Sequence, residues 1–205
     1  MDTSKKVEYP NFVTHLECSL TGEHYEAGIP QGLSKAGRPL LVRYDLDKLA
    51  STITKDEIGS RIGGFWRYRE FLPVTKTENV VALGEVTTPL MHLPTMAKKL
   101  GVKPDRIIVK DEGRLPTGSF KARGLALAVA MAKELGLQHL AMPTNGNAGA
   151  AMAAYASHAG LKTTIFRGGC ITGPNHSGAK LHGFLSYLVK ASLKEKKYSI
   201  IGYKG

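Results

Sequence analysis

The sequence is poor in cysteine and has no long hydrophobic run. Its two cysteines, Cys18 and Cys170, lie far apart without a Cys-x-x-Cys spacing, which argues against a disulfide framework and against a zinc knuckle. No apolar stretch approaches the length that crosses a bilayer. The start, from Met1 to Lys6, lacks the apolar run of a signal peptide. We therefore expect a cytoplasmic protein without a membrane partner.

Acidic residues are also scarce. The chain of 205 residues has 17 Asp and Glu against 28 Lys and Arg, which gives a formal net charge of +11. Much of this excess lies late in the chain, where Glu195 is the single acidic residue after position 160. Basic clusters can bind nucleic acid by releasing counterions, but no RNA-binding signature with interleaved aromatic residues accompanies these. We expect a solvated basic surface and no nucleic-acid partner.

The composition is that of a folded protein, because 42% of the residues are hydrophobic and a chain of this length can bury one large core or two small ones. Three regions of the sequence differ in their residue patterns. Residues 1–55 form an irregular amino-terminal segment, with short strands expected around Leu40 to Tyr44. Residues 56–166 carry regular patterns, and residues 167–205 form a basic tail of unclear structure, in which Phe184 to Val189 could be a helix or a loosely attached segment.

Strand-like and helix-like patterns alternate in the middle region. The segment 56–72 reads as a loop or short helix with an aromatic anchor. The expected strands are 79–83, 106–109, 139–142 and 162–166, and the expected helices are 93–100, 119–135 and 147–158. Strands separated by helices of this length predict an α/β fold, in which βαβ units connect the strands of a parallel sheet.

One lysine stands at the start of an apolar helical run, in the stretch from Pro116 to Gly124. Ser119 is a plausible N-cap, and Lys121 would then lie in the first turn, where the positive end of the helix dipole disfavours an ammonium. A neutral amine is what the attack on an aldehyde requires. The stretch therefore indicates a site where an amine could hold an aldehyde cofactor. The alternative is a surface lysine on an amphipathic helix.

A second turn, from Pro143 to Gly149, leads from an expected strand into an expected helix. Backbone N–H groups at a helix start bind anions, and Gly146 and Gly149 allow a ligand to approach the backbone closely. An ordinary strand-to-helix turn with Asn147 as the cap is the alternative. Both turns would lie at the carboxyl edge of a parallel sheet, where ligands bind in such folds, so the two together predict one pocket.

These segments carry a resemblance to a known family. In their order along the chain, they resemble the threonine synthases among the fold type II pyridoxal-phosphate enzymes, whose fold is tryptophan synthase β-like. The likeness covers about residues 15–166. Its motifs are 84–90, 109–113, 116–124 and 144–149, and the segment from Leu16 to Asp45 is similar to the family's amino-terminal extension.

The resemblance implies a cofactor, a reaction and a set of site residues. Pyridoxal phosphate would bind covalently to Lys121, the catalytic residue, with Phe120 and Asn147 also contacting the cofactor. The substrate would contact Thr88 and the turn made of Thr144, Asn145, Gly146, Asn147, Ala148 and Gly149. The implied reaction converts O-phosphohomoserine and water into threonine and phosphate. The partner is thus a small amino-acid substrate, and we expect that the chain can form a homo-oligomer.

Two departures from the family bear on these expectations. Family members often carry a zinc-ribbon-like unit with paired cysteines, but here only Cys18 remains, while Thr21, Ser34 and Ala36 stand where partner cysteines would be expected. Because one thiolate cannot complete a four-ligand zinc site, we expect no metal. After Phe166 we expect the likeness to stop, so that the chain corresponds to a truncated, amino-terminal part of such an enzyme joined to an unrelated tail.

Three functions therefore stay open. The chain could be a threonine synthase-like lyase, or a truncated, non-catalytic remnant of one. It could also be another fold type II enzyme, such as a serine or threonine dehydratase or a cysteate synthase. The amino-terminal segment and the Pro-Thr-Gly-Ser-Phe-Lys form of the lysine motif favour the synthase.

Overall fold

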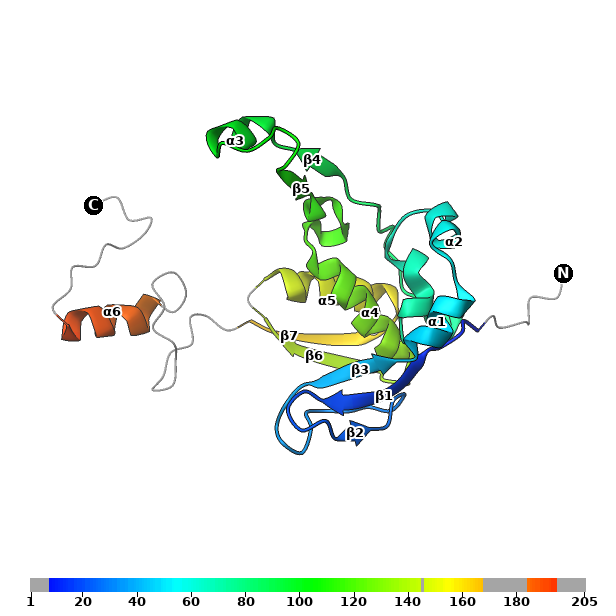
Figure 1. Ribbon diagram of the computed structural model, residues 1–205. Coiled ribbons are helices and arrows are strands. Elements are labelled where there is room, and N and C mark those ends of the chain that lie inside the picture. The colour runs from blue at the N-terminus through cyan, green and yellow to red at the C-terminus, as the bar shows by residue number, and fades with distance from the viewer. Residues whose placement is uncertain (1–7, 145, 168–183, 195–205) are drawn as a thin grey trace. The chain divides into compact units, whose positions relative to one another are not determined.

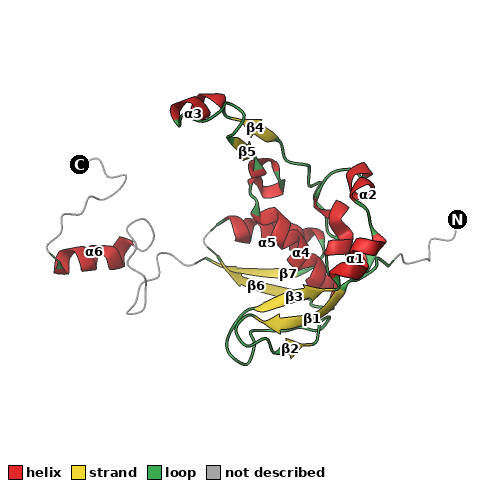
Figure 2. Ribbon diagram, viewed as in Figure 1, coloured by secondary structure: helices red, strands yellow, loops and turns green. Residues whose placement is uncertain are grey.

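The computed structural model describes residues 8–144, 146–167 and 184–194 (Figure 1). The chain divides into two compact units, Met1–Ile165 and Phe166–Gly205. Helices and strands are mixed along the first unit, as Figure 2 shows. The α/β class expected from the sequence is confirmed, although the strands form three small sheets rather than one.

The first sheet lies in the amino-terminal segment. Its strands are β1 (Val13–Cys18), β2 (His24–Tyr25) and β3 (Leu40–Tyr44), all paired antiparallel in the order β2-β1-β3. Cys18 ends β1 and is buried. Its sulfur is hydrogen-bonded to Ser34 Oγ at 3.0 Å and accepts the Thr21 N–H at 3.4 Å, and these bonds lower the pKa of Cys18 to about 7. Through these bonds Cys18, at the end of β1, holds Thr21 in the loop before β2 and Ser34 in the loop after it.

Two short, capped helices follow the first sheet. Asp45 caps α1 (Leu46–Thr52), and Thr54 forms a capping box with Glu57 at the start of α2 (Lys55–Ser60). A 3₁₀ helix, Phe65–Phe71, comes next, and its Trp66 indole N–H donates to the Val81 carbonyl at 3.1 Å. The short helix with an aromatic anchor expected within 56–72 is therefore confirmed.

The strand expected at 79–83 is wrong. A 3₁₀ helix, Thr77–Asn79, is followed there by a loop. The carboxylate of Glu134 accepts the Thr75 N–H at 2.9 Å and the Asn79 side-chain amide at 3.1 Å, while Val81 is buried in the core. A short apolar run reads as a strand from sequence, but here its neighbours bond to a distant helix instead.

The next sheet also departs from the expected parallel arrangement. Strands β4 (Leu90–His92) and β5 (Ile108–Lys110) pair antiparallel. The helix expected at 93–100 is present between them as α3 (Pro94–Lys99), which begins with a proline. This helix has six residues and lies in the connection between the two strands. The expected parallel βαβ unit is therefore wrong for this segment.

A parallel βαβ unit is present further along, as expected. It consists of β6 (His139–Pro143), α5 (Asn147–His158) and β7 (Lys162–Phe166). The Lys162 N–H donates to the Gln138 carbonyl at 3.0 Å. This bond joins the residue before β6 to the first residue of β7, so the two paired strands run in the same direction.

The core of the first unit lies around α4 (Lys121–Glu134) and α5, which pack side by side (Figure 1). Most of its residues are small, so the two helices can approach closely. Its fully buried members are Val74, Val81, Leu115, Ala122, Ala126, Val129, Ala130, Ala151, Tyr155 and Ala156.

In the second unit the structure describes α6 (Phe184–Leu193). The sequence left open whether Phe184 to Val189 is helical, and it is. Cys170 and the lysines beyond Lys194 lie outside the described residues. None of the helices described is both long enough and apolar enough to cross a membrane.

Candidate cofactor and substrate site

The lysine segment begins α4, close to where the sequence places it. A 3₁₀ turn, Pro116–Gly118, leads into Ser119, whose backbone is extended. The Ser119 hydroxyl accepts the Lys121 N–H at 3.3 Å, as an N-cap does. The helix is assigned from Lys121 with Phe120 before it, a difference of one residue that is usual at helix ends. The expected helix from 119 to 135 is thus confirmed.

The Lys121 side chain is exposed. Its Nζ lies 4.8 Å from the centre of the Phe120 ring, a cation–π distance. Among the described residues, no carboxylate, carbonyl or hydroxyl bonds this amine. The amine is therefore accessible and free of an ion pair, as a group that reacts with an aldehyde must be. Two of the three residues expected to contact the cofactor therefore contact each other.

The second turn presents free backbone donors. The Thr144 hydroxyl accepts the N–H groups of Gly146, at 3.3 Å, and Gly149, at 3.2 Å. The N–H groups of Asn147 and Ala148 point from the first turn of α5, and no acceptor for them lies within the described part of the chain. These donors suit an anion such as a carboxylate. Asn145, expected to bind substrate, lies outside the described residues.

Asn147 is exposed and is the first residue of α5, while Gly146 holds the cap position without a side-chain bond. The alternative interpretation, in which Asn147 is only a helix cap, therefore does not describe this turn. Gly149 is buried, and a Cβ there would lie 2.3 Å from Thr144 Cγ2 and 3.2 Å from Ile165 Cγ2. A glycine at 149 thus lets the helix start pack tightly against the strands.

The 3₁₀ turn before Lys121 lies against α5. Residues of Pro116–Gly118 contact α5, and α4 packs against α5. The turn before Lys121 therefore contacts the helix that begins at Asn147, although the sequence separates the two. The expectation that both turns lie at the carboxyl edge of one parallel sheet is wrong, because β5, the strand before the lysine turn, pairs antiparallel with β4 in a sheet separate from β6 and β7.

Thr88 is hydrogen-bonded within a network of charged side chains. It is 3% exposed, and its hydroxyl donates to Glu112 Oε1 at 2.6 Å. Arg123 binds the same carboxylate through Nε at 2.5 Å and Nη2 at 2.9 Å. The Arg123 guanidinium lowers the pKa of Glu112 to about 2, against the opposing effect of burial. A direct contact between Thr88 and the substrate stays a prediction.

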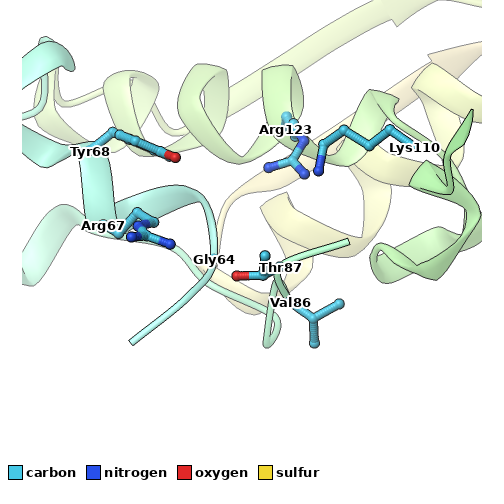
Figure 3. Close-up of a pocket in the computed structure, with 7 residues that line it drawn as sticks. All are labelled: Gly64, Arg67, Tyr68, Val86, Thr87, Lys110 and Arg123. Carbon is cyan, nitrogen blue, oxygen red and sulfur yellow. The ribbon is translucent and has the colours of Figure 1, made fainter. Parts of the chain in front are cut away.

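A pocket of about 130 Å³ lies beside this network. Figure 3 shows the polar ends of its cationic side chains and of its tyrosine pointing toward the same space. Its lining residues are Gly64, Arg67, Tyr68, Val86, Thr87, Lys110 and Arg123. Lys110 and Arg123 both lie by Glu112, at 3.6 Å and 2.5 Å. Three cations and the hydroxyls of Tyr68 and Thr87 give the pocket the character of an anion site.

A buried pair fixes the loop beneath this pocket. The Tyr155 hydroxyl of α5 donates to Glu85 Oε1, and the same oxygen accepts the Leu83 N–H at 3.0 Å. Burial raises the pKa of Tyr155 far above its usual range. Gly64 packs against this loop with φ of 109°, and a Cβ there would lie 2.5 Å from the Glu85 carbonyl oxygen. The loop from Glu85 to Thr88 is thus held against α5.

No sequence pattern pointed to this pocket. Lys110 and Glu112 lie in the motif 109–113 and Arg123 lies in the motif 116–124, but their spacing does not indicate that they bind one another. Arg67 and Tyr68 come from the aromatic segment, which carried no functional signal. The pocket residues do not include Lys121, Phe120 or the turn 144–149.

The fold and the two turns define the class of protein. It is an α/β protein with an exposed lysine amine at one helix start and a turn with unbonded backbone donors at another, features that suit an enzyme holding a carbonyl cofactor. The sequence profile described as "Pyridoxal-phosphate dependent enzyme" matches residues 81–195. The chain belongs to this family. The match extends past Phe166, so the expectation that the likeness stops there is wrong.

Curated relatives agree with this membership. The chain is 34% identical over 148 residues to a threonine synthase of Methanocaldococcus jannaschii, which covers 72% of the chain and 36% of the relative. It is 48% identical over 98 residues to a threonine synthase of Halalkalibacterium halodurans, covering 48% of the chain and 27% of the relative.

A third relative bears a different name. It is the 2-amino-4-ketopentanoate thiolase beta subunit of Acetoanaerobium sticklandii, 46% identical over 78 residues, or 37% of the chain and 17% of the relative. In all three cases the matched segment spans little more than a third of the relative, or less. The chain is therefore similar to part of each relative only.

Proposed function

We propose that the chain is the part of a threonine synthase-like lyase that contains the cofactor-binding lysine. Such a lyase converts O-phosphohomoserine and water into threonine and phosphate. The observation that carries the proposal is an exposed Lys121 amine without a bonding partner among the described residues, at the start of a helix that packs against α5, in a chain whose relatives include threonine synthases. The residues present fit pyridoxal phosphate, because the amine is accessible and the turn offers free donors.

Each part has a distinct role in this proposal. Pyridoxal phosphate, when bound, stores the electron pair released as protons leave the substrate carbons. Lys121 holds the cofactor and, once released, accepts and returns protons at its Nζ. The N–H groups of Asn147 and Ala148 bind the substrate carboxylate, and the Phe120 ring limits the positions open to the Lys121 amine.

The cationic pocket offers a place for the phosphate of the substrate. Arg67, Lys110 and Arg123 line it together, and Arg67 Nε has no hydrogen-bond partner within the described part of the chain. A phosphate would compensate the charge of these side chains. Glu112 keeps Arg123 in place, so that its guanidinium faces the pocket before the substrate arrives.

Two measurements on the purified chain test the proposal. Pyridoxal phosphate is added first, and the absorption band of the lysine-linked cofactor is recorded. O-phosphohomoserine is then added, and phosphate and threonine are assayed. Lys121→Ala should lose the band and the activity, while Lys99→Ala, which changes another exposed lysine on α3, should keep both. A band that survives in Lys121→Ala would overturn the role of this residue.

The same experiment separates the alternatives. A cofactor band without turnover would favour a non-catalytic remnant. Release of ammonia and a keto acid from serine or threonine would favour a dehydratase, and formation of cysteate would favour a cysteate synthase. The cytoplasmic location, the homo-oligomer, the lack of a nucleic-acid partner and the boundaries 1–55, 56–166 and 167–205 remain proposals that rest on the sequence.

A further inference from the structure

Three metal-binding side chains gather on one face of the first sheet, outside the site described above. His15 and Glu17 are two apart on β1, so both project from the same face of the strand. His24 on β2 is paired directly with Glu17 in the register. One ligand atom from each of the three lies within 4.8 Å of the others.

His15 points an unused nitrogen into this cluster. Its Nε2 is buried and has no hydrogen-bond partner in the part of the chain that the structure describes, although it lies 3.9 Å from a Glu17 oxygen. The Thr14 hydroxyl has one proton, which it donates to the Arg43 carbonyl at 3.3 Å. With its proton on Nδ1, His15 donates to Thr14 Oγ1 across the contact of 2.9 Å. In neutral His15 this leaves a lone pair on Nε2.

That arrangement is the one found around metal-binding histidines, where a second group fixes the ring and leaves the other nitrogen free for the ion. Glu17 is fixed as well, because its Oε1 accepts from Arg43 Nη2 at 2.5 Å. Its Oε2 faces His15. His24 is exposed, and its ring centre lies 3.9 Å from that of His15, so an ion can reach the cluster from solvent.

We propose that His15, Glu17 and His24 bind a divalent zinc ion. Two imidazole nitrogens and one carboxylate oxygen are a known zinc donor set, with the fourth position left to water. Imidazole ligands favour zinc over magnesium or calcium, which prefer all-oxygen sites. Donors of a zinc site lie closer together than these do, so binding would require small rotations of the three side chains. The expectation of no metal rested on missing cysteines, and this donor set contains none.

The ion would bridge β1 and β2, because its ligands come from both strands. The two strands are joined by only two residues of β2, so a shared ion would add stability that a short edge strand lacks. This proposal does not depend on the proposed function, since none of the three residues belongs to the cofactor turns or to the pocket.

Calorimetric titration of the metal-free full chain with zinc chloride tests the site. We expect saturable binding of one ion per chain, and a rise in the thermal midpoint on adding zinc. His24→Ala should weaken binding at least about tenfold and remove the thermal shift, because losing a ligand costs no less than losing a residue that supports one. Thr14→Val, which removes only the support of His15, should weaken binding about tenfold.

Two control variants separate this site from other donors. His92→Ala changes an exposed histidine on β4 and should leave binding unchanged. Cys18→Ser tests whether the thiol of the same segment holds the ion, and it too should leave binding unchanged. Absence of saturable binding, or equal binding by wild type and His24→Ala, would overturn the proposal, and so would loss of binding in Cys18→Ser.

Discussion

At the scale of single residues, ion pairs and hydrogen bonds decide which charged side chains are accessible to a ligand. Among the described residues, Lys121 has no partner but the Phe120 ring, whereas Arg123 is held by a carboxylate through two nitrogens. The Lys121 amine is therefore accessible to a ligand, whereas the Arg123 guanidinium is held in place beside the pocket. Glu112 holds Arg123 in place, because its carboxylate binds both the Arg123 guanidinium and the Thr88 hydroxyl.

Glu112→Gln should destabilise the fold in a way that depends on pH. The folded pKa of Glu112 is about 2, below its ordinary value of 4.5, so its contribution is present above about pH 4.5 and is lost as the pH falls toward 2. We expect the variant to lose about 2 kcal/mol at neutral pH, with the difference from wild type shrinking below pH 4.5. Urea unfolding at several pH values measures this.

The exposed Glu26 offers a matched comparison. Glu26→Gln should unfold like wild type at every pH. A Glu112→Gln variant whose deficit stays constant down to about pH 3 would show that the carboxylate charge contributes nothing, and that the loss comes from packing alone.

Residues of the candidate site were predictable where the signal is local. Lys121 and Asn147 each follow a turn and begin a helix, and the sequence shows both features directly. Arg67 and Lys110 line one pocket, yet they lie on segments that only the folded chain brings together. The His15 and His24 cluster depends likewise on the pairing of β1 with β2, which no local pattern reveals.

At the scale of elements, α4 and α5 pack closely because many of their buried residues are alanines. Its Ala151 and Ala156 are fully buried, as are Ala122, Ala126 and Ala130 of α4. The long helices were well predicted because such periodic runs are unambiguous. The strand at 79–83 failed because a short apolar run is also compatible with a buried loop, and Glu134 from α4 supplies the bonds a sheet would have made.

A pair of glycine substitutions tests this close fit. In Gly149→Ala the new methyl group would lie 2.3 Å from Thr144 Cγ2, which forces the start of α5 away from the strands. We expect a loss of about 1–3 kcal/mol and weaker cofactor binding. Gly124 on α4 has no neighbour within 4 Å of such a methyl group. Gly124→Ala should therefore stabilise the protein by up to about 1 kcal/mol through helix propensity.

Thermal and urea unfolding of both variants give the comparison. Equal stability of Gly149→Ala and wild type would mean that Thr144 turns aside at little cost, and that the turn is less tightly packed than the geometry indicates.

At the scale of the whole molecule, apolar surface is unevenly distributed. Exposed hydrophobic side chains recur along the segment from β4 to β5, where Leu90 is 62% exposed and Ile108 is 49% exposed. The others there are Met91, Met96, Leu100, Val102 and Val109. Concentrations of exposed apolar side chains mark sites of association. A net charge of +11 opposes association by repulsion.

The balance between these two forces predicts how the chain associates. Raising the salt concentration screens the repulsion but leaves the apolar attraction intact, so the mass measured by light scattering should rise with salt and with protein concentration. Leu90 and Ile108 share a face of the β4–β5 ribbon. Leu90→Lys combined with Ile108→Lys should therefore hold the chain monomeric, whereas Leu33→Lys, at a residue 67% exposed elsewhere, should not. A double variant that associates like wild type would place the interface on another surface.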